Sequence, residues 1–153
     1  PFAVKTVPLF TWKRRPTTKR WGKSIQTFFL IKLPPKISIF TPYTDEINQS
    51  VAEYFKKENI EVVSLTYFDI ASDLDIGKVD PDYLFEVLSK IDLSTSDALF
   101  VSCTALPVLS LIDKLEKKLG KVVLSSNQTL IWDTLKEINY NKNIDGFGQL
   151  FKD

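Results

Sequence analysis

The sequence predicts an α/β domain whose parallel sheet is covered by helices on both faces. Short apolar runs alternate along the chain with segments whose apolar residues recur at helical spacing, the pattern of strand–helix–strand units. The 153 residues suit about one domain with a sizeable core. A hydrophobic content of 44% and a charged content of 25% are ordinary for a globular protein.

Four strands are expected, and each is a short run rich in apolar or β-branched residues. They span Ile37–Thr41, Ile60–Leu65, Ala98–Val101 and Val122–Leu124. Ala98–Val101 is wholly apolar, which indicates a central strand buried on both faces.

Four helices are expected between and after these strands. They run from Thr44 or Asp45 to about Glu58, from Asp80-Pro81 through Ile91, from Leu106 to Leu119, and from Thr129 to about Ile138. Asp80 is a good N-cap with proline at the first helical position, and Gly120 ends the third helix. Thr66–Val79 is expected to be a polar loop with a short helix. This order predicts a flavodoxin-like three-layer domain with a four-stranded parallel sheet.

The charge is divided sharply along the chain. Residues 1–36 carry nine Lys and Arg and no Asp or Glu, whereas residues 37–153 carry eleven basic and nineteen acidic residues. These net charges of +9 and −8 give the +1 of the whole chain. The change predicts a boundary between a basic, irregular segment, residues 1–35, and an α/β domain, residues 36–153.

Three interpretations of the basic segment remain open. It could be an arm for nucleic acid, with Trp12 and Trp21 available for stacking, or a transit peptide, which is rich in Arg and poor in acids. It could also be an unrelated or truncated start joined to the domain. We favour the last, because everything after Pro35 is regular and this segment is not, and nucleic acid is therefore not the expected partner.

The composition excludes several classes of site. One cysteine and no histidine rule out an internal disulfide, a zinc site and a Ser-His-Asp or Cys-His arrangement built from this chain alone. An unpaired cysteine fits a reducing compartment, so a cytoplasmic protein is expected. No glycine-rich phosphate loop and no run of about 18 apolar residues is present, so neither a nucleotide cofactor nor a membrane span is expected. The clusters Lys56–Glu58 and Glu116–Lys118 are expected to be solvated helix faces.

Three polar turns follow predicted strands, and parallel strands end at one edge of a sheet. They are Thr41–Thr44, Ser102–Thr104 and Ser125–Gln128. Cys103 is expected between a central strand and the N-terminus of the next helix, where backbone N–H groups favour a thiolate and bind a small carboxylate. The alternatives are a structural cysteine that packs as a small hydrophobe, and turns that only cap helices.

Several spaced motifs, in this order, resemble the aspartate/glutamate racemase superfamily. They look most like its branch of maleate cis-trans isomerases, arylmalonate decarboxylases and ectoine-utilisation proteins. The resemblance covers about Lys36 to the end of the chain. The motifs are Phe40–Asn48, Leu99–Leu106, Ile112–Glu116, Leu119–Gln128, Trp132 and Gly146–Gly148.

The resemblance implies a fold of two similar α/β halves with the active site in the cleft between them, of which this chain looks like the second half. Each half of such an enzyme supplies one cysteine, and that role carries over to Cys103 as the catalytic residue. The implied substrate-binding residues are Tyr43, Ser102, Thr104 and Asn127. Ser126 and Gln128 are implied as residues at the border of the site. No metal or cofactor is implied.

The implied activity is a cysteine-dependent cis-trans isomerase or racemase acting on a small dicarboxylate such as maleate. The first half and its cysteine are not recognisable in the sequence, so the site is expected to be incomplete in this chain, which leaves open a homo-oligomer or a partner half-domain. One alternative is a cofactor-independent decarboxylase of malonate-type acids that uses a single cysteine as proton donor. Another is a non-catalytic half-domain or basic-armed binding module.

Overall fold

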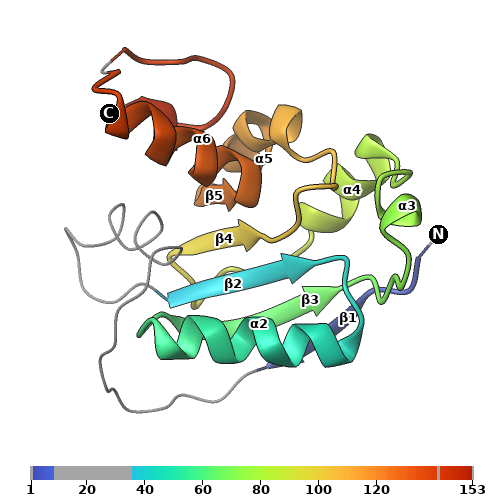
Figure 1. The fold of residues 1–153 in the computed structure, drawn as a ribbon. Coiled ribbons are helices and arrows are strands. Elements are labelled where there is room, and N and C mark those ends of the chain that lie inside the picture. Colours follow the sequence, from blue (N-terminus) through green and yellow to red (C-terminus); the bar gives the residue numbers. More distant parts are fainter. Residues whose placement is uncertain (1, 9–35, 141, 153) are drawn as a thin grey trace.

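The fold is a three-layer α/β domain built on a five-stranded sheet (Figure 1). The computed structural model describes residues 2–8, 36–140 and 142–152. The sheet has the strand order β1-β3-β2-β4-β5, and β2, β3, β4 and β5 run parallel. The strands are β1 (Lys5–Pro8), β2 (Lys36–Thr41), β3 (Glu61–Tyr67), β4 (Ala98–Val101) and β5 (Val122–Ser125).

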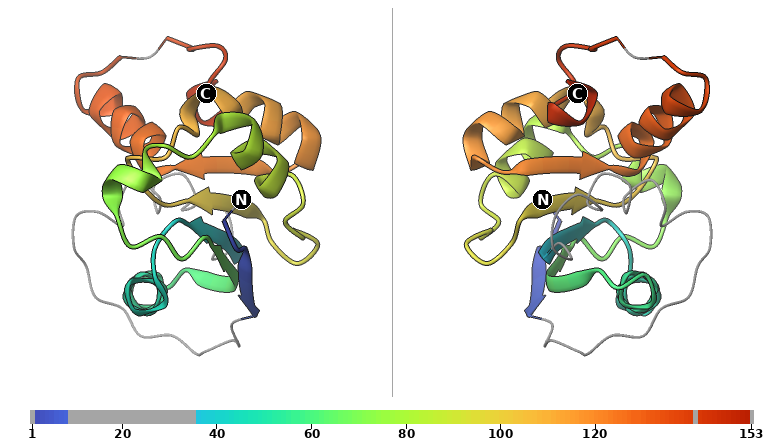
Figure 2. Two further views of the ribbon diagram at one scale, coloured as in Figure 1. Left: turned by 90° about the vertical axis from the view of Figure 1, so that its right-hand side faces the viewer. Right: turned by 90° about the vertical axis from the view of Figure 1, so that its left-hand side faces the viewer.

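Helices cover both faces of the sheet, with α2 and α6 on one side and α5 on the other (Figure 2). The α-helices are α2 (Asp45–Lys57), α3 (Asp73–Ile76), α4 (Pro81–Leu88), α5 (Ile112–Leu119) and α6 (Ser126–Glu137), and the short 3-10 helices are η1 (Leu109–Leu111) and η2 (Gln149–Phe151). Among the described residues, none of the helices combines the length and the apolar composition of a membrane span.

The alternation of side chains along the strands divides the core into two layers. Phe40, Leu99 and Val101 belong to one buried cluster, together with residues of α4 and α5. Ile39 and Phe100 belong to the other, together with residues of α2 and α6. Successive strand residues point to opposite faces of the sheet, so the apolar runs of β2 and β4 are buried on both faces. These are the central strands of the sheet, as the sequence predicts for Ala98–Val101.

The sheet has one strand more than the predicted four. β1 pairs antiparallel with β3, with Lys5 opposite Tyr67 and Pro8 opposite Ser64. It lies within the segment expected to be irregular, and its four residues show no apolar period. Its partner strand is some sixty residues away, which a local pattern cannot reveal. Residues 9–35, with Trp12 and Trp21, lie outside the described residues, so the boundary near residue 35 stays a prediction.

Two helix starts differ from the prediction. The residues from Leu106 do not begin a helix: η1 starts at Leu109 and α5 at Ile112. Pro107 disfavours helical backbone at the residue before it, and this delays the start. By contrast α6 begins at Ser126, before the predicted Thr129, because Ser125 and Gln128 form a reciprocal capping box.

The two charged clusters are not wholly solvated faces, because Glu58 and Glu116 are buried. Glu116 on α5 accepts hydrogen bonds at both carboxylate oxygens, at 3.1 Å from the Val123 N–H and at 2.8 Å from the Gln149 N–H. Burial raises the pKa of this carboxyl above its ordinary value. Glu116 therefore fastens the C-terminal segment to β5, while Lys117 beside it is exposed and pairs with Asp113.

Candidate functional site

The site lies where the connections of the sheet change direction. From β2 the chain passes to β3 on one side of β2 and then to β4 on the other. The loops that leave β2 and β4 therefore start at the point where the strand order reverses, at the carboxyl ends of the strands, which is the usual ligand position in open α/β sheets. Tyr43 follows β2 and Cys103 follows β4, so this topology brings the two predicted residues to one place.

Cys103 lies in a tightly held loop. It is a free cysteine with 5% of its surface exposed, and its backbone has a φ of 155°, a conformation that residues with a side chain seldom adopt. Its N–H donates to Ser126 Oγ at 3.2 Å, and the Ala105 N–H donates to its Sγ at 3.3 Å. Backbone strain of this kind persists only where the surroundings hold it, and it is concentrated at functional sites.

The position of Cys103 relative to the helices corrects one expectation. The helix that follows it in sequence starts only at Leu109, so Cys103 does not lie at that helix's N-terminus. Its loop is instead held by Ser126, the first residue of α6. The N–H group that reaches the thiol comes from Ala105 within the loop.

Tyr43 is partly buried and packs against the buried cluster that contains Cys103. Burial raises the pKa of Tyr43, hydrogen bonding and charge interaction with Cys103 raise it further, and a hydrogen bond from Ser102 lowers it by less. The negative charge of Asp73, at the start of α3, also raises it. The phenol is therefore protonated at neutral pH and is available as a hydrogen-bond donor next to the thiol.

Thr104 and Asn127 lie together at the outer side of the Cys103 loop. Asn127 Nδ2 donates to the Thr104 carbonyl at 3.0 Å, so Asn127 shapes the loop whatever else it binds. Within the described residues the Thr104 N–H donates to no protein acceptor, and it remains available to an anion. That Ser102, Thr104, Asn127 and Tyr43 contact a substrate stays a prediction.

Two residues near the site were not predicted from the sequence. Asp73 adds a negative charge near Tyr43. Asn48, buried on α2, donates from its side chain to the Tyr43 carbonyl at 3.0 Å. Asn48 closes the motif Phe40–Asn48, and a lone amide among the apolar positions of a helix was the signal that could have indicated it.

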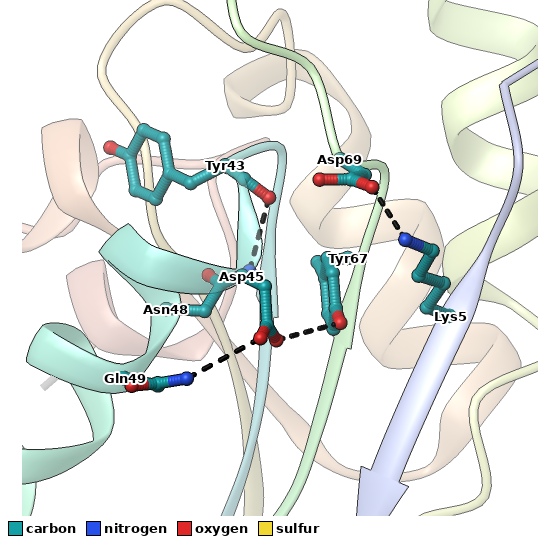
Figure 3. A network of polar contacts seen from close by, with 7 residues as sticks. All are labelled: Lys5, Tyr43, Asp45, Asn48, Gln49, Tyr67 and Asp69. Atoms are coloured by element: carbon teal, nitrogen blue, oxygen red, sulfur yellow. Dashed lines mark hydrogen bonds and ion pairs between the residues drawn. The ribbon is translucent and has the colours of Figure 1, made fainter.

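A set of polar contacts, some exposed and some part-buried, borders the turn that follows β2 (Figure 3). Asp45 accepts from the Tyr67 hydroxyl at 2.9 Å and from Gln49 at 3.3 Å, while Lys5 of β1 pairs with Asp69. These contacts tie β1, β3 and α2 together beside the site. Across residues 2–8, 36–140 and 142–152, His, Cys, Asp and Glu side chains form no group of three that could hold a metal ion.

The sequence is similar to those of maleate isomerases and of an arylmalonate decarboxylase. The maleate isomerase of Geobacillus stearothermophilus is 32% identical over 116 residues, 75% of this chain and 46% of that protein. The arylmalonate decarboxylase of Bordetella bronchiseptica is 25% identical over 119 residues, 76% of this chain and 50% of that protein. The chain thus spans about half the length of the curated relatives it matches.

A solved structure shows the same fold. It is the maleate cis-trans isomerase of Nocardia farcinica, determined as a cysteine-to-serine variant with a covalently bound succinylcysteine intermediate. The superposition has a TM-score of 0.73 at 22% identity and covers 78% of this chain and 49% of that one. The sequence model of the arylmalonate decarboxylase family matches residues 33–151. The chain belongs to the arylmalonate decarboxylase family.

Proposed function

We propose that this chain is a cysteine-dependent isomerase acting on a small dicarboxylate such as maleate, with Cys103 as the catalytic residue. The observation that carries the proposal is the packing of Tyr43 against the buried cluster that contains Cys103, at the switch point of the sheet. The maleate isomerases among the relatives support the choice of substrate.

In the nucleophilic role, Cys103 Sγ forms a bond to one olefinic carbon of maleate. The π-electron pair moves to the neighbouring carbon, which takes up a proton. The bond between these two carbons is then single and can rotate. Loss of the proton and cleavage of the C–S bond restore the double bond in the trans form, fumarate, so that no atom or electron is gained or lost.

In the proton-carrier role, Cys103 delivers and removes that proton while a second thiol makes the C–S bond. The Nocardia enzyme carries a succinyl group on a cysteine while another cysteine is replaced by serine, in keeping with the resemblance, which implies one cysteine in each half. Because this chain has one cysteine, we propose that a second α/β domain faces it, supplied by a partner half-domain or a second copy. A reducing, cytoplasmic setting is proposed for the same unpaired thiol.

Substrate binding is assigned to hydrogen-bond donors rather than to cationic side chains. The protonated Tyr43 hydroxyl and the Thr104 N–H donate to one carboxylate, with Ser102 and Asn127 at its border. Preorganised donors in a shielded site stabilise negative charge that develops on a substrate. In the addition step, this charge develops on the carbon next to a bound carboxylate.

Formation of fumarate from maleate, followed by proton NMR, tests the proposal. The wild-type chain, Cys103→Ala and Cys103→Ser are compared, and Asn139→Ala serves as a control far along the chain. The proposal predicts fumarate with the wild type and the control, and none above the uncatalysed rate with either Cys103 variant. Equal rates of fumarate formation with the wild type and Cys103→Ala overturn the isomerase assignment. No fumarate from the wild-type chain alone overturns the version in which a second copy supplies the facing domain.

A second candidate is a decarboxylase of malonate-type acids, and the single cysteine favours it. There the bond to one carboxylate breaks, carbon dioxide leaves, and the electron pair left on the α-carbon takes the Cys103 proton. Release of carbon dioxide from an arylmalonate that depends on Cys103, without fumarate from maleate, selects this reaction. Absence of both reactions, together with no protection of Cys103 by maleate or an arylmalonate, selects the non-catalytic binding module.

A further inference from the structure

Asn48 occupies a closed ring of hydrogen bonds around the backbone of Tyr43. The Thr41 hydroxyl donates to Asn48 Oδ1 at 2.5 Å, and Asn48 Nδ2 donates to the Tyr43 carbonyl at 3.0 Å. The Tyr43 N–H donates back to Thr41 Oγ1 at 3.2 Å. Both polar groups of the Tyr43 backbone are therefore fixed by two side chains.

Both side chains of this ring of hydrogen bonds are buried, with Thr41 0% exposed and Asn48 2% exposed, whereas Tyr43 itself is half-buried. Water therefore does not reach either side chain unless the turn opens. A buried donor or acceptor left without a partner is costly. The two residues come from the end of β2 and the second turn of α2, and they hold the intervening loop from both sides.

The chemistry of the ring requires an amide at position 48. One atom must accept from Thr41 while another donates to the Tyr43 carbonyl, and among side chains of this length only asparagine offers both. Aspartate keeps the acceptor but places a second oxygen against the carbonyl oxygen. Only two rotatable bonds join the Tyr43 phenol to the backbone. By fixing that backbone, the hydrogen bonds of Thr41 and Asn48 restrict where the phenol can lie.

We propose that Asn48 is a positioning residue, which holds the Tyr43 hydroxyl against Cys103 at the switch point. Its side-chain hydrogen bonds go to Thr41 and to the Tyr43 backbone, so it acts through Tyr43. The inference rests on the proposed function for the use made of Tyr43, whereas the positioning itself can be tested without a substrate.

The test is the ultraviolet titration of the Tyr43 phenol. The chain has five tyrosines, so the Tyr43 signal is obtained as the difference between each protein and the same protein with Tyr43→Phe. In the wild type, burial and Cys103 hold the pKa of Tyr43 far above its ordinary value. Asn48→Ala and Asn48→Leu, neither of which adds a charge near the phenol, are expected to bring the pKa of Tyr43 down toward the ordinary tyrosine value of about 10.

Gln49→Ala is the matched control, because Gln49 is the next residue on α2 and its side-chain amide contacts Asp45 rather than Tyr43. It is expected to leave the Tyr43 titration unchanged. Circular dichroism verifies that each variant is folded. An unchanged titration in both folded Asn48 variants overturns the proposal. So does failure of both to fold, because Asn48 is then a residue of stability rather than of position.

A second readout separates this inference from the proposed function. Protection of Cys103 by maleate against iodoacetamide is measured in the same proteins. If the wild type is not protected, the proposed function is contradicted, and the Tyr43 titration still decides the role of Asn48. If the wild type is protected, the Asn48 variants are expected to need about fivefold more maleate, the effect of one weakened hydrogen bond.

Discussion

Replacement of Glu116 by glutamine tests how the C-terminal segment is held to the domain. The carboxylate accepts from the Val123 N–H on β5 and from the Gln149 N–H next to η2. Gly148 lies against the same carboxylate, since a Cβ there would come within 3.1 Å of it. Glutamine has one acceptor oxygen, so one of the two N–H groups would face an amide NH₂ instead.

The expected loss follows from that mismatch. A buried donor left without an acceptor costs about 2 kcal/mol, and for a chain of this size such a loss lowers the melting temperature by about 4–8 °C. Thermal unfolding followed by circular dichroism at neutral pH measures it. Glu53→Gln is the matched control, because Glu53 is exposed on α2, and it is expected to change the melting temperature by little.

The pH dependence has a definite sign. Burial raises the pKa of Glu116 above its ordinary value, so between the unfolded and folded values the folded state binds more protons than the unfolded state. The free energy of unfolding contributed by this group is therefore fully present at acid pH and falls as pH rises through the raised folded pKa. The advantage of the wild type over Glu116→Gln is expected to shrink over that window and then level off.

Two results would refute this reasoning. Equal melting temperatures for Glu116→Gln and Glu53→Gln would mean that the two hydrogen bonds contribute nothing to stability. A wild-type advantage that grows as pH rises through the window would mean that the folded state favours the charged carboxylate, contrary to the effect of burial.

Three further predictions concern the tail and the site. Gly148→Ala is expected to lower the free energy of unfolding by about 1–3 kcal/mol, because its φ is +85° and a Cβ would lie 2.6 Å from Ile112 Cγ2. Gly120→Ala, which has open space around it, is expected to lower it by less in the same chemical denaturation. Ser126→Ala removes the acceptor for the Cys103 N–H, so we expect iodoacetamide to react with Cys103 about fivefold faster; an unchanged rate contradicts a role for Ser126 in holding the loop. Asp73→Asn removes a negative charge near Tyr43. Because this charge repels the maleate dianion, half-maximal protection of Cys103 should then need about half as much maleate. An unchanged maleate concentration would mean that the charge of Asp73 does not act on the bound ligand.

The central strands could be predicted because their signal is local. Ala98–Val101 is apolar at every position, and the strand has those bounds. The turns after β2 and β4 followed from the order of elements, since parallel strands end at one edge. Cys103 and Tyr43 could therefore be assigned to one site before their contact was known.

The features that were missed depend on partners distant in sequence. Lys5–Pro8 forms strand β1 because it pairs with β3. Glu116 is buried beneath the C-terminal segment, where the Gln149 N–H donates to it. A charged residue beside two lysines looks the same in sequence whether or not such a partner arrives. The late start of α5 was different, because Pro107 was visible and its effect on Leu106 outweighed the apolar period.

The most direct test of the central claim is the rate at which iodoacetamide alkylates Cys103, with and without maleate, in the wild type and in Tyr43→Phe. If Tyr43 and Cys103 form one dicarboxylate site, maleate slows alkylation of the wild type, and Tyr43→Phe needs several-fold more maleate for the same effect, about the loss of one hydrogen bond to a charged group. A wild-type rate that is the same with and without maleate would contradict the account.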